Sequence, residues 1–298
     1  MNNIAIIGGC GFIGSYTKNE LEEHGYNVTT IDINKNSDIC CNVLDFNSLK
    51  KALSTKKFNA IYMFAAISDS KENHTDVKHA VNTNIMTLTN TLDAMYELNI
   101  PRIIFSSTVW VYSVCDSIEV NEDSNLSITN SEHIYTTCKL TCEAIIRNYH
   151  KVKNIDFTIL RYGIAYGPGC HPDTVMSKFI NNAIDIKPLI VTGDGSIYRN
   201  FLYVTDHARG NRLALSDKGK NQIFNLEGPQ PISIKNVAER VQELHGKNVK
   251  IIYTGERLGD YKGKLVSNLK AKQLLNWEPK VNFLKGSKLL YNYIKNES

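Results

Sequence analysis

Short apolar runs alternate with longer segments of helical periodicity over the first half of the chain. The apolar runs are rich in β-branched residues and are expected to be strands at Ile4–Ile7, Val28–Ile33, Ala60–Ala65, Ile103–Ser106 and Phe157–Leu160. The segments between them are expected to be helices near Gly14–Glu23, Phe46–Ser54, Asn84–Leu98 and Tyr135–Lys151. Strands that are apolar on both faces and alternate with helices predict an α/β fold with a parallel sheet covered on both sides.

The alternation becomes irregular after Gly167-Pro168-Gly169. Further turns are indicated at Lys187-Pro188, Gly193-Asp194-Gly195 and Gly228-Pro229. One more strand is expected over Arg199–Val204, a helix from Asp206, another helix after Ser233, and a largely helical tail over Leu269–Ile294. The stretch Asp116–Glu132 is expected to be an exposed loop.

The composition is that of a folded protein with a sizeable core, because 42% of the 298 residues are hydrophobic and 21% are charged. The net charge of +4 is too small and too scattered to predict a nucleic-acid-binding surface. No apolar run approaches the roughly 18 residues of a membrane span, and Met1–Ile7 has no basic segment typical of a signal peptide. Seven cysteines without zinc-site spacing favour the cytoplasm and predict no metal site.

Arginine is scarce among the 34 basic residues, and none precedes Arg102. A coding bias toward lysine is the simplest explanation. The alternative is that some arginines occupy places where a planar, forked donor is needed.

A glycine-rich turn joins the first expected strand to the first expected helix. Gly8-Gly9-Cys10-Gly11-Phe12-Ile13-Gly14 fits G-x-G-x-x-G and also G-x-x-G-x-x-G. Glycines there allow a tight turn and close approach to a pyrophosphate, and the helix N-terminus supplies N–H groups for the anion. Asp32 ends the next strand about 20 residues on, where a carboxylate binds a ribose diol and disfavours a 2′-phosphate. The pattern predicts a Rossmann-type, doubly wound domain that binds NAD rather than NADP.

A tyrosine and a lysine share one helix face at Tyr135 and Lys139, which are spaced i, i+4. A nearby ammonium group is expected to lower the tyrosine pKa, as proton transfer with a substrate hydroxyl requires. Ser106-Ser107-Thr108 ends an expected strand, where α/β sheets bind their ligands, so a hydroxyl there can hold the substrate oxygen beside Tyr135.

These motifs, in this order, resemble the extended short-chain dehydrogenase/reductases, and most closely the NAD-dependent epimerase/dehydratase family that acts on nucleotide sugars. The resemblance covers essentially the whole chain. It extends to Leu160-Arg161-Tyr162 with Tyr166-Gly167-Pro168, Gly193-Asp194-Gly195 with Arg199-Asn200-Phe201, Arg257-x-x-Asp260 and Trp277-x-Pro279.

The resemblance implies a role for each matching position. Catalysis would fall to Thr108, Tyr135 and Lys139. The cofactor would be bound by Gly8, Gly11, Phe12, Ile13, Gly14, Asp32, Asn42, Val43, Ala65, Ala66, Asn84, Ser106, Tyr135, Lys139 and Tyr162. The nucleotide-diphosphate sugar would be bound by Thr108, Arg199, Arg257 and Asp260. Residues 1–166 would form the NAD-binding domain, with 199–227 returning to it, and 167–198 with 228–298 would form a smaller α/β substrate lobe. A homodimer through the helices near Asn84–Leu98 and Tyr135–Lys151 is also implied.

Two positions depart from the family pattern. Ile164 replaces a family asparagine and cannot donate that residue's amide hydrogen bond to the substrate diphosphate. Thr108 is followed by Val109-Trp110 rather than by the Asp-Glu pair of the family's dehydratases, which argues against a dehydratase.

Three functions are compatible with the chain. The leading hypothesis is a nucleotide-sugar epimerase that oxidises and re-reduces the sugar C4 through a transient 4-keto sugar, with Tyr135 moving the O4 proton. The first alternative is a 4-ketoreductase of deoxysugar synthesis that consumes NAD(P)H. A non-catalytic nucleotide-binding module is the remote alternative, because Thr108, Tyr135 and Lys139 are all present.

Overall fold

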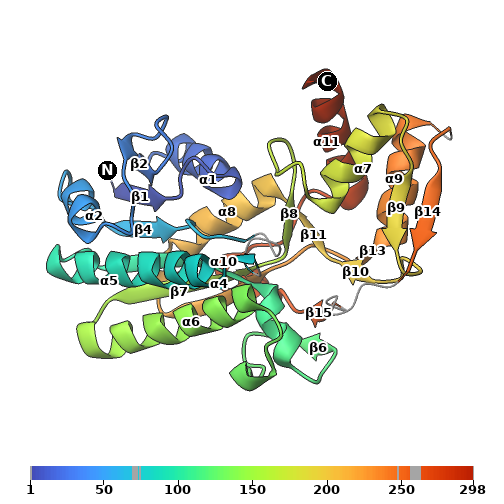
Figure 1. Cartoon of the computed structure of the whole chain (residues 1–298). Helices are drawn as coiled ribbons and strands as arrows, with labels where there is room; N and C mark the ends of the chain where they lie inside the picture. Colours follow the sequence, from blue (N-terminus) through green and yellow to red (C-terminus); the bar gives the residue numbers. More distant parts are fainter. Residues whose placement is uncertain (1, 69–72, 74, 247, 256–262, 298) are drawn as a thin grey trace.

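A seven-stranded parallel sheet forms the centre of the larger part of the molecule (Figure 1). The computed structural model describes residues 2–68, 73, 75–246, 248–255 and 263–297. The strands lie in the order β12-β7-β5-β4-β1-β2-β3, and every neighbouring pair is parallel. Their bounds are β1 Asn3–Ile7, β2 Asn27–Asp32, β3 Ile39–Cys40, β4 Ala60–Met63, β5 Arg102–Thr108, β7 Asp156–Tyr162 and β12 Gln222–Leu226. Because β1 lies between β2 and β4, the strand order reverses beside it, where sheets of this kind open a ligand crevice.

Helices cover both faces of this sheet. The helices α2 (Phe46–Leu53), α5 (Thr87–Glu97) and α6 (Ile134–Lys153) pack on one face, and α1 (Phe12–Glu23), α8 (Val204–Ala214) and α10 (Leu269–Leu275) pack on the other. Alternate residues of β1 enter the two cores: Ala5 and Ile7 face the first, and Ile4 and Ile6 face the second. The uninterrupted apolar strands of the sequence follow from this burial on both sides.

One helix begins earlier than the sequence indicates. The expected start near Asn84 lies inside a continuous helical stretch formed by α4 (Val77–Val81), the π-helical turn η1 (Asn82–Met86) and α5. The Asp76 side chain caps its beginning by accepting a hydrogen bond from the His79 N–H at 2.9 Å.

A smaller lobe packs three helices around a core of its own (Figure 1). The helices are α7 (Val175–Ile184), α9 (Ile234–His245) and α11 (Phe283–Glu297). Four two-stranded sheets, three of them adjoining this lobe, pair β9 (Leu189–Thr192) with β14 (Ile251–Thr254), β8 (Ile164–Tyr166) with β11 (Phe201–Tyr203), β10 (Tyr198–Arg199) with β13 (Ile232–Ser233), and β6 (Glu119–Val120) with β15 (Leu265–Val266). The described residues also form the 3-10 turns η2 (Val109–Val114), η3 (Ile128–Asn130) and η4 (Asp217–Gly219).

One part of the chain that the sequence assigned to the smaller lobe packs against the larger one. Ala271, Leu275 and Trp277 are buried in the same core as Ile4 and Ile6 of β1. The Trp277 indole N–H also donates to the Asp206 carbonyl at 3.0 Å. A fully buried indole needs apolar neighbours and an acceptor for its N–H. The core beside the sheet provides the apolar neighbours, and α8 provides the acceptor.

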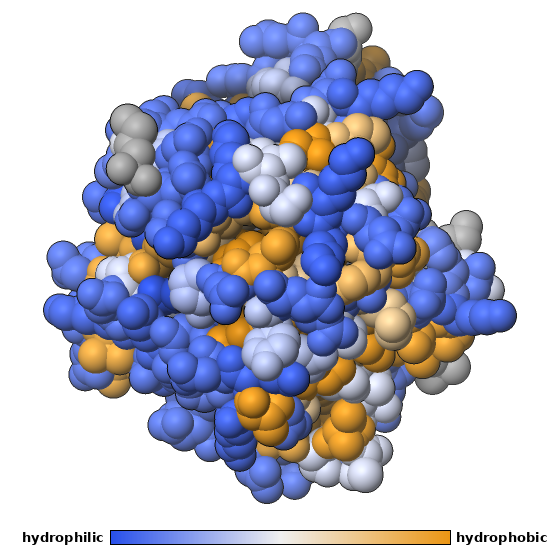
Figure 2. Space-filling view, turned by 90° about the vertical axis from the view of Figure 1, so that its left-hand side faces the viewer, coloured by the Kyte–Doolittle hydropathy of each residue, from blue (hydrophilic) through white to orange (hydrophobic). Residues whose placement is uncertain are grey.

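The amino ends of the strands lie on the left-hand side of Figure 1, and Figure 2 views that side directly. This face is hydrophilic over most of its area, with smaller apolar patches between. Among the described residues, no helix is both long and apolar enough to cross a membrane.

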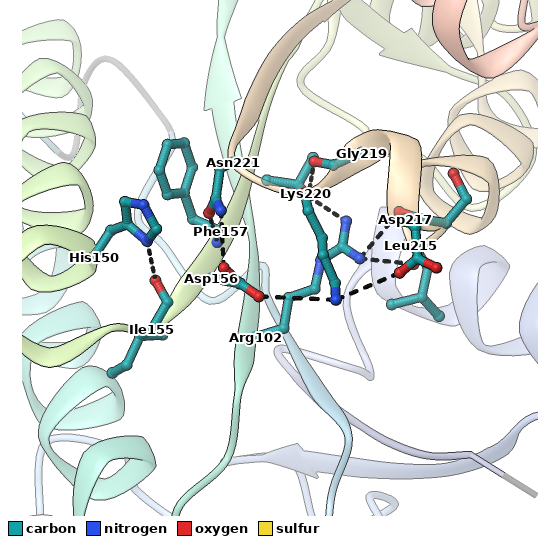
Figure 3. Close-up of polar contacts among 12 residues, drawn as sticks. Arg102, His150, Ile155, Asp156, Phe157, Leu215, Asp217, Gly219, Lys220 and Asn221 are labelled. Atoms are coloured by element: carbon teal, nitrogen blue, oxygen red, sulfur yellow. Dashed lines mark hydrogen bonds and ion pairs between the residues drawn. The ribbon is translucent and has the colours of Figure 1, made fainter.

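Arg102 braces this end of the sheet (Figure 3). Its guanidinium donates to the carbonyl oxygens of Ala214, Leu215 and Ser216 at 2.7, 2.8 and 3.1 Å, and to the Thr158 hydroxyl at 2.8 Å. Ala214 and the C-cap Leu215 form the C-terminal end of α8, whose last carbonyls have no partner within the helix, and Ser216 follows directly. A forked cation therefore ties α8 to β5.

Candidate active site

A cleft opens at the carboxyl ends of β1, β4, β5 and β7, beside the start of α1, with a volume of about 530 Å³. Most residues expected at the site come together there. The cleft is lined by Gly8, Gly11, Phe12, Ile13, Gly14, Ala66, Ser106, Thr108, Tyr135, Lys139 and Tyr162. Residues far apart in the chain thus meet at one edge of the sheet, as expected for parallel strands.

The glycine-rich turn forms a cradle at the start of α1. Gly8 has a φ of +82°, and a Cβ there would lie 2.5 Å from the Ala65 nitrogen, so the turn requires glycine. Gly11 is the N-cap of α1 and has no side chain to cap the first-turn N–H groups. A Cβ on Gly11 would have no neighbour closer than the Gly8 carbonyl oxygen at 3.3 Å. These N–H groups and the open space before them fit a dinucleotide pyrophosphate.

Asp32 joins this cradle to the end of β2. Its Oδ2 accepts a hydrogen bond from the Cys10 N–H at 3.0 Å, and its Oδ1 accepts one from the Asn34 N–H at 3.1 Å. An ionised carboxylate has about four acceptor positions, so both oxygens can still accept from a ribose diol. Asn42 is exposed nearby, and Val43 is buried in the core under α2, where the Asn90 amide donates to its carbonyl at 3.0 Å.

Lys139 lies deep in the cleft, one helical turn beyond Tyr135. Its Nζ donates to the Ser106 carbonyl at 2.7 Å and lies 5.5 Å from the centre of the Tyr135 ring. Burial lowers the pKa of Lys139 to about 8. The expectation that Lys139 lowers the Tyr135 pKa is wrong for the protein alone: burial raises the pKa of this phenol, with smaller contributions from Cys142 and Cys138. The positive ring of oxidised nicotinamide, when bound, would add a second cation beside the phenol.

Thr108 ends β5 and lines the cleft. Its Oγ1 accepts a hydrogen bond from the Trp110 N–H at 3.2 Å, which starts the turn η2. The hydroxyl can therefore still donate to a substrate oxygen in the cleft. Ser106 differs, because its hydroxyl already donates to the Met63 carbonyl at 2.9 Å.

Asn84 braces the cleft from behind and does not line it. Its side chain accepts from the Ile67 N–H at 2.8 Å and donates to the Ile67 carbonyl at 3.1 Å. The side chain is buried and pairs with the backbone that follows β4, so this structure places Asn84 as a support for Ala65 and Ala66. Tyr162 also has a fixed partner: its hydroxyl donates to the Asn211 side chain at 2.6 Å.

The far wall of the cleft contains aromatic residues outside the expected site. The Trp110 and His133 rings pack edge to face at 5.4 Å and both line the cleft.

Beyond Trp110 lies a recess that contains Arg199, whose guanidinium is 5.9 Å from the Trp110 ring. Arg257 and Asp260 lie outside the described residues. Glu227 also lines this recess and was missed; its position directly after the buried strand β12 was an available signal.

Comparison with known proteins gives a consistent picture. The model of the NAD dependent epimerase/dehydratase family matches residues 4–226. A UDP-glucuronate 4-epimerase of Thermodesulfobacterium geofontis is 31% identical over 254 residues, which are 85% of this chain and 77% of that protein. A UDP-glucose 4-epimerase of Corynebacterium glutamicum is 29% identical, covering 93% of this chain and 90% of that protein.

Solved structures agree in fold over nearly the whole chain. The UDP-glucose 4-epimerase of Thermotoga maritima, crystallised with UDP-glucose, superposes with a TM-score of 0.92 at 25% identity, covering 99% of each chain. The UDP-glucuronic acid 4-epimerase of Bacillus cereus, in complex with UDP-glucuronic acid and NAD, gives a TM-score of 0.89 at 29% identity, covering 99% of this chain and all of that one.

Proposed function

This chain belongs to the NAD dependent epimerase/dehydratase family, and we propose that within it the protein is a nucleotide-sugar 4-epimerase. Membership of this family means that the protein is an enzyme and that its cofactor is NAD. The relatives named above are epimerases of UDP-glucose and UDP-glucuronate, so a UDP-sugar is the first substrate to test.

One observation carries the proposal: Thr108, Tyr135 and Lys139 line the same cleft as the bare N-terminus of α1. The α1 N–H groups would hold the cofactor pyrophosphate, Asp32 the adenosine ribose, and Lys139 the second ribose. Bound NAD would supply the redox chemistry of the family, taking up and returning a hydride without net consumption.

The residues of the chain would handle the substrate hydroxyl. Tyr135 would accept the proton of the sugar 4-hydroxyl and give it back after the sugar has turned over in the cleft. Thr108 would donate a hydrogen bond to the same oxygen and hold it beside Tyr135. The overall change would be inversion at C4 through a transient 4-keto sugar.

A 4-ketoreductase would use the same three residues. We keep it as the second candidate because of Ile164. This residue lines the cleft with an apolar side chain, which offers the substrate no hydrogen bond. A substrate that differs from those of the relatives would be consistent with such a wall.

One experiment separates the two functions. The NAD-loaded protein is incubated with UDP-, dTDP-, GDP- and CDP-sugars, and the products are followed by NMR. Interconversion of 4-epimers without added NADH supports the epimerase. Stoichiometric loss of NADH with a 4-keto sugar would instead establish the reductase.

Tyr135→Phe is expected to abolish either activity, because the phenolic oxygen that would take up and return the proton is lost while the aromatic ring remains. General acid–base catalysis contributes about 10²–10⁴-fold, so turnover should fall by at least about a hundredfold. Tyr149→Phe is the matched control: it lies on the same helix, and its hydroxyl donates to Asp93 at 2.8 Å. Retained turnover in Tyr135→Phe would remove this residue from its proposed role.

A further inference from the structure

A buried ion pair lies beside Lys139 on the same helix. Tyr135, Lys139 and Glu143 are spaced four residues apart on α6, so they lie on one helix face. Lys139 and Glu143 are both only 4% exposed. Arg161 of β7 donates to both Glu143 oxygens, from Nε at 3.0 Å and from Nη2 at 2.7 Å. This forked contact holds the carboxylate in one orientation, one helical turn beyond Lys139.

The strand β5 meets Lys139 with consecutive residues. The Lys139 ammonium group lies 4.7 Å from the centre of the Phe105 ring, and it donates to the Ser106 carbonyl at 2.7 Å. Ser107 follows and points to the same face of the sheet as Phe105, because side chains alternate along a strand. Phe105 is buried in the core under α6, so the Ser107 side chain also faces that helix.

The Ser107 hydroxyl ties this strand to the ion pair. It donates to Glu143 Oε1 at 2.5 Å, a short charge-assisted hydrogen bond. The peptide group between Ser106 and Ser107 carries the carbonyl that accepts from Lys139. A chain of contacts therefore runs from Arg161 through Glu143 and Ser107 to the acceptor of the Lys139 ammonium group.

We propose that Ser107 is a positioning residue: by holding the Ser106 carbonyl in place, it fixes the Lys139 ammonium group where that group binds the nicotinamide ribose. The inference rests on the proposed function, which gives Lys139 this ribose and gives Ser107 no role. Three neighbouring residues then have three tasks. Ser106 supplies the carbonyl, Ser107 anchors the strand to Glu143, and Thr108 faces the substrate.

Loss of this anchor should change the titration of Lys139. A carbonyl that accepts from an ammonium group stabilises its charged form, so the pKa of Lys139 should fall when the acceptor is no longer held. In the intact protein burial lowers this pKa to about 8, against the opposing influence of Cys142, Cys138 and Glu143. A neutral amine donates weaker hydrogen bonds than an ammonium group does, so NADH should bind less tightly once Lys139 loses its proton.

Ionisable groups on the elements packed against α6 set the background of this titration. Arg161 of β7 contacts Glu143 and also donates to the Tyr112 hydroxyl of η2 at 2.8 Å. The Tyr135 ring of α6 itself lies 5.5 Å from the Lys139 Nζ. On α4 and α5 the ionisable residues are Asp93, which accepts from Tyr149, and the exposed Lys78, His79, Tyr96 and Glu97. Substitution of Ser107 removes none of these groups.

Fluorescence titration of the full chain with NADH, between pH 6.5 and pH 9.5, tests the proposal. The wild-type affinity is expected to fall about fivefold as Lys139 loses its proton. In Ser107→Ala the midpoint of this fall should lie about one pH unit lower, because a hydrogen bond to a charged group is weakened. This variant should fold, since both Glu143 oxygens keep an Arg161 donor. Ser107→Thr restores a hydroxyl at the same position and should restore the wild-type midpoint.

Thr158→Val is the matched control, because the buried Thr158 hydroxyl also contacts a buried cation, Arg102 at 2.8 Å, at the opposite end of the sheet. It should lower the melting temperature and keep the wild-type midpoint, including any part that the Cys10 thiol beside the cradle causes. A purely structural role of Ser107 would likewise move only the melting temperature.

An unchanged midpoint in Ser107→Ala, or a wild-type affinity that does not vary with pH, would overturn the inference. Neither result depends on turnover of a sugar. The expected shift in NADH binding, combined with no interconversion of any nucleotide sugar, would instead support the role of Ser107 and exclude the proposed epimerase.

Discussion

At the scale of single residues, two of the scarce arginines are buried braces. Arg102 holds the end of α8, and Arg161 pairs with Glu143 inside the molecule. Arg161 Nε and Nη2 donate to the two Glu143 oxygens at 3.0 and 2.7 Å, and Nη1 donates to the Tyr112 hydroxyl at 2.8 Å. Lysine has no planar fork for such a set of acceptors. A forked donor is therefore needed at these two places, although scarcity alone did not single out these arginines and neither of them lines the cleft.

Replacing Arg161 is expected to destabilise the fold. Arg161→Met leaves Glu143 buried without a cation, which costs about 3–5 kcal/mol in the free energy of unfolding. Urea denaturation at neutral pH measures this loss. Arg147→Met, on the exposed surface of α6, should change stability by less than about 0.5 kcal/mol. A loss below about 1 kcal/mol in Arg161→Met would show that the ion pair does not stabilise the fold.

At the scale of elements, the two glycines Gly8 and Gly11 at the start of α1 are needed for different reasons. Gly8 is required by the turn itself, because its φ is +82° and the Ala65 backbone is in contact. Gly11 has an ordinary φ of −73°, and a Cβ there would meet one atom closely, the Gly8 carbonyl oxygen at 3.3 Å, so the backbone conformation does not require glycine and a small shift would admit alanine. Its hydrogen atom instead leaves space at the N-terminus of α1 for a ligand.

Gly11→Ala is therefore expected to weaken cofactor binding while leaving the fold intact. The methyl group would push the pyrophosphate away from the helix N–H groups, and losing one charge-assisted hydrogen bond of about 1.5–3 kcal/mol lowers affinity at least about tenfold. Fluorescence titration with NADH measures the affinity, and thermal denaturation checks the fold. Gly255→Ala, at a glycine away from the cleft with open space at its Cβ position, should bind NADH normally. Unchanged affinity in Gly11→Ala would place the pyrophosphate elsewhere.

At the scale of the whole molecule, the outer surface of α4, η1 and α5 carries exposed apolar side chains. Val77, Val81 and Met86 are 43%, 38% and 42% exposed, and Tyr96 follows on the same helical stretch at 49%. The family resemblance places a homodimer interface on this helix and on α6. We propose that these side chains become buried there in a second copy of the chain.

Met86→Asp is expected to shift the protein toward the monomer, because it would place a charge in the proposed interface. Sedimentation equilibrium in the micromolar range should show at least a tenfold rise in the dimer dissociation constant, equivalent to about 1.4 kcal/mol. Ile252→Asp on β14 is the matched control, since Ile252 is also 42% exposed but lies in the smaller lobe. Equal effects of the two substitutions, or a monomeric wild type, would exclude this interface.

The sequence by itself determined the parallel sheet, its two helical layers, the glycine cradle and the Tyr135–Lys139 pair. Each of these depends on local information: apolar runs, helical spacing, or glycines between a strand and a helix. The carboxyl ends of parallel strands lie at the same edge of the sheet. The sequence therefore also implied that Thr108 and the glycine cradle lie in one cleft. The strands β3 and β12 and the early helix start at Val77 carry weaker local patterns and became evident only in the structure.

Tertiary structure decided what depends on partners distant in the chain. Asn84 braces Ile67, Arg161 pairs with Glu143, and Glu227 fills the space at Gly163, and no spacing rule connects these residues. The pKa of Tyr135 belongs to the same class. Its i, i+4 lysine was visible in the sequence, but the burial that raises the pKa of the phenol is a property of the packed molecule. Patterns along a chain report periodicity and conformation, whereas desolvation and contact are set by everything that folds around a residue.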